Sequence, residues 1–171
     1  MHACTATVLG VTQTVGKNDN VDVTAPASVP SGGWFVVTLA PEPEMAPGNM
    51  GMFTVVDIRN VTQRITLVNA TLKGLTLSGG SANVGTTSVT ISGSVISVTV
   101  SGPIPGGASF TLPALALSLT AGVAGMPALV ELTGHDLTFT TVVRSGTFAI
   151  NAPTSCVPVP DPTILSSTDV T

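Results

Sequence analysis

Apolar and polar residues alternate along most of the chain, and turn-forming residues separate the alternating segments. A period of two is typical of strands with one buried face, and many short strands at regular spacing are typical of packed antiparallel sheets. The extended region 53–77 predicts two or three strands, with bends near Asn60 and Asn69. Further strands are predicted at residues 5–9, 21–23, 34–39, 88–91, 95–100, 108–112, 115–119, 129–132, 137–143 and 147–150. No helical stripe of useful length interrupts this pattern.

Glycine and proline mark the connections between these strands. Ser92-Gly93-Ser94 indicates a hairpin, while the three prolines and two glycines of residues 41–51 are incompatible with a regular ladder and predict a loop. From residue 158 onward proline, serine and threonine dominate, which predicts an extended or mobile tail. We therefore expect one β-sandwich domain at residues 1–157 and a C-terminal tail at residues 158–171.

The expected fold is an all-β, two-sheet antiparallel sandwich of immunoglobulin-like or jelly-roll-like order, with about nine to eleven strands. A parallel β-helix would require a fixed internal repeat, and the sequence contains none. Composition agrees, because 26 threonines and 24 valines are branched at Cβ and favour extended backbone.

Charge excludes several functions. Only 8% of residues are charged, and the five lysines and arginines are spread singly. No basic patch can therefore neutralise nucleic-acid phosphates or an anionic membrane surface. No run of about 18 apolar residues is present, so no transmembrane helix is expected.

The two cysteines lie near opposite ends of the predicted domain, at Cys4 and Cys156. Paired, they would close a loop nearly as long as the domain, a constraint of roughly 5 kcal/mol in the chain-entropy relation. Pairing suits an exported chain, while two free buried thiols, or a lipoprotein with an acylated Cys4, are the alternatives. We interpret Met1-His2, which leads straight into Ala3-Cys4 without a signal peptide, as an artificial addition before a mature N-terminus. The expected location is secreted or cell-envelope.

Three segments resemble those of bacterial surface proteins. VTAPASVPSGG at residues 23–33, followed by apolar Phe35, Val37 and Leu39, resembles the opening strands of bacterial surface immunoglobulin-like modules. VSGPIPGGASFTLP at residues 100–113 looks like their late hairpin. With APTSC at residues 152–156, the set is similar to secreted actinobacterial immunoglobulin-like β-sandwich proteins of unknown function, over roughly residues 4–160. The resemblance implies export, a sandwich and a terminal disulfide, and it carries no catalytic residues.

His135-Asp136, with Glu131 close in sequence, comes nearest to a catalytic pair. A hydrolase needs Ser, His and Asp to converge, whereas neighbours on a strand point to opposite faces unless Gly134 bends the chain. We interpret the pair as a turn entering the strand at residues 137–143. We expect no enzymatic activity and no cofactor.

Asp19, Asn20 and Asp22 place oxygen donors at the alternating spacing that Ca²⁺ favours. The segment lacks the Gly and the terminal Glu of a complete calcium loop, and a turn rich in Asn and Asp requires the same residue types. We expect no metal site here and keep these residues only as candidates.

Met45, Met50 and Met52 lie in or beside the proline-rich loop. We interpret them as covering one end of the core. Contact with a partner protein and binding of Cu(I) are the alternatives, because methionine is an adaptable apolar contact and a soft ligand.

Trp34 is the single tryptophan, and the chain has no tyrosine. Sugar-binding faces generally need aromatic platforms, so this scarcity argues against a carbohydrate-binding module, and we expect Trp34 to lie in the core.

The first functional hypothesis is a non-enzymatic exported surface or envelope module that acts by protein–protein contact or self-assembly. Few charges leave hydroxyl-rich faces, and sheet edges permit strand addition. The alternative is a carrier that holds a lipid or other apolar ligand between the sheets. The expected partner is another protein or a further copy of the chain, so a homo-oligomer is one outcome.

Overall fold

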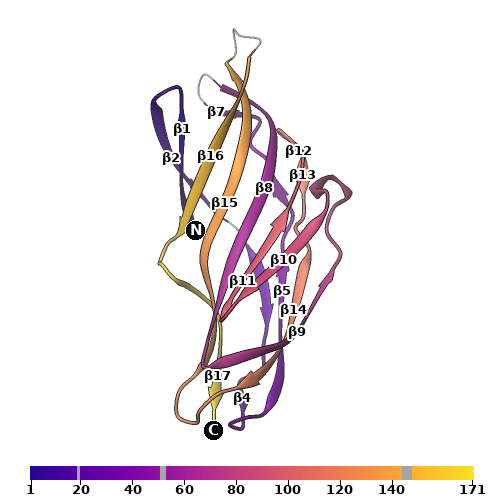
Figure 1. Cartoon of the computed structure of the whole chain (residues 1–171), viewed down its shortest axis with the longest axis vertical. Coiled ribbons are helices and arrows are strands. Elements are labelled where there is room, and N and C mark those ends of the chain that lie inside the picture. Colours follow the sequence, from indigo (N-terminus) through magenta and orange to yellow (C-terminus); the bar gives the residue numbers. More distant parts are fainter. Residues whose placement is uncertain (19, 51–52, 144–147) are drawn as a thin grey trace.

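Two long strands form the axis of the molecule (Figure 1). The computed structural model describes residues 1–18, 20–50, 53–143 and 148–171. Strands β8 (Phe53–Val68) and β15 (Ala128–Val143) have 16 residues each and pair antiparallel from Val68–Leu129 to Phe53–Val143. Neither contains proline, so each can donate to its neighbours along its whole length.

The main sheet is built outward from these two strands. Its order is β10 (Thr87–Ser92), β11 (Val95–Val100), β8, β15, β16 (Ala149–Pro158), β1 (His2–Val8) and β2 (Val11–Lys17). Two short strands, β7 (Asn49–Met50) and β12 (Ile104–Pro105), also pair with β8. β17 (Thr163–Val170) pairs with the first half of β15 and runs parallel to β4 (Ser28–Val29).

A second sheet of four strands packs against one half of the main sheet. Its order is β3 (Val21–Thr24), β5 (Trp34–Pro41), β14 (Ala114–Ala121) and β9 (Ala70–Ser78). The remaining elements are the pair β6 (Glu44–Met45) and β13 (Ser109–Phe110) and the 3₁₀ turn η1 (Ala82–Val84). No helix in the described ranges is long and apolar enough to cross a membrane.

The interior divides into two apolar clusters, one along each half of β8 and β15. The first fills the space between the two sheets and includes Val37, Ile65, Ile96, Leu117 and Val130. The second lies under β1, β16 and the other half of β8 and β15, where β6, β12, β13 and η1 cover it; it includes Val55, Ile58, Ile104, Phe110 and Phe139. The halves of one strand pair thus serve two cores.

The all-β, two-sheet antiparallel fold class is confirmed. Asn60 and Asn69 both have positive φ, at 52° and 49°, and mark a ladder irregularity in β8 and the turn into β9, where the sequence predicted bends. Gly93, at φ 60°, forms the predicted hairpin between β10 and β11. The described residues form twelve strands of four or more residues, and five two-residue strands lie among them.

The largest differences between the strands and the prediction lie in three places. Residues 129–132 and 137–143 belong to a single strand, because β8 pairs with β15 continuously through bulges near Gly134. β2 was not predicted at all. The tail prediction for residues 158–171 is wrong for Thr163–Val170: these residues form β17, which buries Ser166, Thr168 and Val170 against β15 and β4.

Cys4 and Cys156 are joined by a disulfide that ties the first strand to β16. The two residues are directly opposite each other in the β1–β16 ladder, and both are buried in the second cluster. Their separation of 152 positions means that the bond closes almost the whole fold into one loop.

We expect the Cys4→Ser/Cys156→Ser variant to remain folded but to lose about 5 kcal/mol of unfolding free energy, because its unfolded chain regains the entropy of a very long loop. Urea unfolding of oxidised wild type, reduced wild type and the variant measures this. Reduced wild type is the matched control and should behave like the variant. An unfolding midpoint equal to that of oxidised wild type would contradict the expectation.

Candidate functional site

The outer face of the four-stranded sheet carries the exposed side chain of Trp34, the single tryptophan of the chain. Phe148, outside this sheet, is also exposed, at 81%. Trp34 is 66% exposed at the start of β5, so the expectation that it lies in the core is wrong. Phe35, Val37 and Leu39 point inward, and strict alternation then directs Trp34 to the opposite face. The sequence therefore contained the signal that places Trp34 outside, namely the parity of its strand.

The residues that surround Trp34 in the β5–β14 ladder are short and uncharged. Trp34 is opposite Thr120, Val36 is opposite Ser118 and Thr38 is opposite Ala116 in the β5–β14 ladder. On the far side of β14, Gly74 is opposite Ser118 and adds no side chain to the surface. A Cβ built at Gly74 would lie 3.7 Å from the Ser118 Cβ. We call the six residues of this β5–β14 ladder the Trp34 face.

Charge is confined to the margins of the Trp34 face. None of its six residues is ionisable, while Asp22 on β3 and Lys73 on β9 are exposed at the two outer strands. An aromatic side chain on an uncharged surface with a charged rim is the common composition of protein-contact sites.

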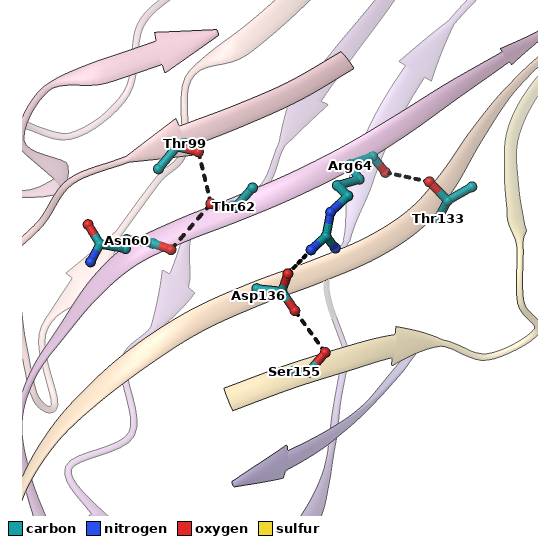
Figure 2. A network of polar contacts seen from close by, with 7 residues as sticks. All are labelled: Asn60, Thr62, Arg64, Thr99, Thr133, Asp136 and Ser155. Carbon is teal, nitrogen blue, oxygen red and sulfur yellow. Dashed lines mark hydrogen bonds and ion pairs between the residues drawn. The ribbon is translucent and has the colours of Figure 1, made fainter. Parts of the chain in front are cut away.

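The outer face of the main sheet is polar and internally paired (Figure 2). Arg64 of β8 forms an ion pair with Asp136 of β15, and Ser155 of β16 donates a hydrogen bond of 2.8 Å to the other Asp136 oxygen. Gly134 makes room for this contact, because a Cβ there would lie 2.5 Å from an Arg64 guanidinium nitrogen. The Arg64 and Asp136 charges thus offset each other across the strands.

Threonine hydroxyls extend this polar face to both sides. Thr62 and Thr99 approach to 2.8 Å between β8 and β11 (Figure 2). Farther along the sheet, the β1–β2 pairs Thr5–Thr14 and Thr7–Thr12 lie at 3.1 and 3.0 Å. An open hollow beside the ion pair is lined by Thr5, Thr7, Asn60, Asp136, Leu137, Thr138, Pro153, Thr154 and Ser155. Within this lining Ser155 donates to Asp136, while Thr5 and Thr7 approach Thr14 and Thr12 outside it. The hollow therefore offers hydroxyl groups around a carboxylate that is already paired with Arg64.

The structure separates His135 from Asp136, as alternation requires. His135 is fully buried, whereas Asp136 is half-buried on the outer face and bound to Arg64 and Ser155. The two residues lie in continuous strand, so the interpretation of a turn is wrong. The His135 ring instead packs edge-on against His2, with centroids 5.3 Å apart. His2 is itself buried and is the first residue of β1, so it belongs to the main sheet.

The remaining predicted site residues are dispersed. Asn20 donates to Glu42 at 3.1 Å and Asp22 is exposed on β3, while Asp19 lies outside the described residues. In the ranges that the structure describes, no three His, Cys, Asp or Glu side chains come together as a metal site.

Of the three methionines, Met45 is 66% exposed on β6. The Met50 side chain and all of Met52 lie outside the described part of the chain. Met45 lies at the mouth of an apolar pocket of about 280 Å³ between β2, β6 and the main strands. Its lining is Cys4, Gly16, Lys17, Met45, Pro47, Ile58, Phe110, Leu137 and Phe139. Lys17 contributes the charge at this lining and is paired with Glu44 at 2.6 Å.

Comparison with known proteins supports the fold alone. The most extensive of the likenesses described here is to a candidate membrane-anchored protein from Corynebacterium diphtheriae, with a TM-score of 0.58 and 16% identity; the match covers 99% of this chain and 36% of that one. Weaker likenesses, too low to carry an argument, are to an uncharacterized immunoglobulin-like protein from Nocardia farcinica (TM-score 0.39, 15% identity, 88% and 98% covered) and the major pilin subunit of Bacillus cereus (TM-score 0.45, 13% identity, 96% and 47% covered). No protein-family model and no curated sequence matches the chain.

A second ion pair lies farther along β8 and is less exposed on its acidic side. Arg59 binds the largely buried Asp57 with two hydrogen bonds, of 3.1 and 2.9 Å. This contact lowers the pKa of Asp57 below its ordinary value of 3.8 and outweighs the opposite effect of burial; a hydrogen bond from Thr140 lowers it further. A depressed carboxyl pKa contributes stability that is present above the unfolded pKa and lost as the pH falls through the folded pKa.

We therefore expect Arg59→Gln to be less stable than wild type at neutral pH, with the difference shrinking as the pH falls from about 5 to about 2. Urea unfolding over this pH range measures it. Arg59→Lys is the control: it keeps the charge but loses the two-pronged hydrogen bond, and should fall between the two. A difference that does not vary with pH would contradict the assignment.

Proposed function

We propose that the chain is a non-enzymatic module of the cell surface or envelope that acts by contact with another protein. The observation that carries this proposal is the exposed Trp34 on a sheet face whose other residues are not ionisable. Large aromatic side chains dominate the energetics of protein interfaces. An exposed tryptophan surrounded by short side chains contributes nothing to the core, so the stability of the fold does not explain its presence.

The location outside the cytoplasm is part of this proposal. A disulfide that closes nearly the whole fold persists in oxidising compartments. The likeness to the Corynebacterium protein supports it through the fold, and this chain spans about a third of that protein's length. The placement of the ionisable groups supports the non-enzymatic part of the proposal: His135 is buried, and Asp136 and Asp57 are each bound to an arginine.

The proposal predicts that Trp34→Ala weakens partner binding without unfolding the protein. Because the side chain is exposed, the unfolding free energy should change by no more than about 0.5 kcal/mol. Affinity for the partner should fall by about 2 kcal/mol, or about thirtyfold, if Trp34 is the interface anchor. Thr38→Ala, on the same face, is the matched control and should bind like wild type.

The measurement exposes immobilised wild type, Trp34→Ala and Thr38→Ala to extracellular and envelope fractions of the producing organism and quantifies the retained proteins. A protein retained by wild type and Thr38→Ala but lost from Trp34→Ala supports the proposal. Equal retention on all three would remove the Trp34 face as the contact. Trp34 also serves as the reporter, because the chain has no other tryptophan and no tyrosine, so its emission should shift to shorter wavelength on binding.

A carrier of an apolar ligand is the second candidate, and the pocket below Met45 favours it. Its volume of about 280 Å³ lies just under the 300 to 1,000 Å³ that is usual for ligand sites, which argues against a large lipid.

Native mass spectrometry of protein purified from its own source decides between these functions. Protein contact predicts the bare mass, alone or in discrete complexes. An apolar adduct that leaves on gentle activation, and rebinds after delipidation, would favour the carrier instead.

A further inference from the structure

The two sheets end in four strands that have one unpaired side within the described structure: β2 and β10 in the main sheet, and β3 and β9 in the second. Such edges expose backbone donors and acceptors to any strand that can approach, and natural proteins protect them with charges, proline or glycine irregularities. Three of the four carry a charge: Lys17 in β2, Asp22 in β3 and Lys73 in β9. β10 carries none.

The sequence of β10, Thr-Ser-Val-Thr-Ile-Ser, contains no charge, proline or glycine over its six residues. Its ladder with β11 is regular from Thr87–Val100 to Ser92–Val95, so no bulge interrupts the strand before the hairpin turn. Val89 and Ile91 are opposite the buried Val98 and Ile96, yet Ile91 is 55% exposed. The inward-facing side of β10 is therefore partly exposed to solvent at Ile91.

The opening continues onto the second sheet. A groove of about 380 Å³ lies between β9 and the β10–β11 turn, and its lining includes Leu72, Leu75 and Ile91. Leu72, Leu75, Leu77 and Val89 are partly buried against the first core cluster. The apolar interior thus reaches the surface along this side.

We propose that β10 pairs antiparallel with β10 of a second copy of the chain, which joins the two main sheets into one. Rotation about a two-fold axis through Thr90 places Val89 opposite Ile91 of the other copy, and Ser88 opposite Ser92. Apolar residues then meet apolar residues on the inner face, and hydroxyls meet hydroxyls on the outer face. The incoming Val89 and Thr87 cover the groove beside β9.

A second copy fits this edge better than a charged partner because of the charge distribution. No Lys, Arg, His, Asp or Glu occurs between Gly74 and Val130, a segment that contains β10, β11 and β14. Two β10 strands can therefore pair without placing like charges opposite each other, although each chain carries a net charge of −4 and Lys73 also lines the groove beside β9. A six-residue strand pair is smaller than a standard interface of about 1,600 Å², so the dimer is weak and forms where the local concentration is high.

This inference is a form of the protein contact proposed above, but it uses a different surface from the Trp34 face. Either surface can fail its test while the other passes. Loss of binding in Trp34→Ala concerns the partner protein, and the variants of β10 concern only the association of the chain with itself.

A Thr90→Cys variant tests the register. Residues on the two-fold axis of an antiparallel pair lie with Cα atoms about 4.5 Å apart when they are not hydrogen-bonded to each other, which is within reach of a disulfide. Mild oxidation should yield a covalent dimer of Thr90→Cys, whereas the control Thr76→Cys, an exposed position on the β9 edge, should stay monomeric. Equal cross-linking of both variants, or of neither, would overturn the proposal.

A Thr90→Lys variant tests the interaction without a cross-link. It sets two ammonium groups opposite each other at the axis, so the dissociation constant in sedimentation over a concentration series should rise about tenfold or more. Thr76→Lys adds the same charge to β9 and should leave it unchanged. A wild type that stays monomeric at every concentration, or a dimer that Thr90→Lys leaves intact, would overturn the proposal.

Discussion

The antiparallel pairing of β8 with β15 is the constraint on which the rest of the structure depends. Every other strand of the main sheet reaches its place through one of these two, and the two apolar clusters lie along successive halves of the pair. The ladder continues through irregularities near Asn60 and Gly134, and such bulges bend a strand and increase its twist.

Both outer faces offer little free charge, for different reasons. On the main sheet, Arg64 and Asp136 offset each other, and threonine pairs fill the space between strands. On the second sheet, the β5–β14 ladder contains no ionisable side chain at all. Such faces bind through shape, hydroxyl groups and a few apolar anchors, so specificity depends on the anchor that protrudes, which here is Trp34.

Local chemistry explains which predictions were correct. Asn60, Asn69 and Gly93 tolerate positive φ, so bends and a hairpin at these positions followed from residue type. Prediction failed where a local signal competed with a distant partner. Gly134-His135-Asp136 has the composition of a turn, yet pairing with β8 keeps it in a strand. The C-terminal segment, rich in proline and serine, forms β17 because it pairs with the first half of β15. Trp34 was expected in the core because tryptophan is hydrophobic, although the alternation of its strand places it on the outer face.

The sequence by itself determined the strand-forming segments, their inward and outward faces, most of the turns and the low charge, because each depends on residues within a few positions of one another. Only the tertiary structure decided which strands neighbour one another, and therefore which edge is bare. Arg64 meets Asp136 across 72 positions, and Cys4 meets Cys156 across 152. The unpaired sides of β10 and β9 exist only because of the sheet order. Alternation specifies the face of each residue, but the order of the strands is set by packing of the whole chain.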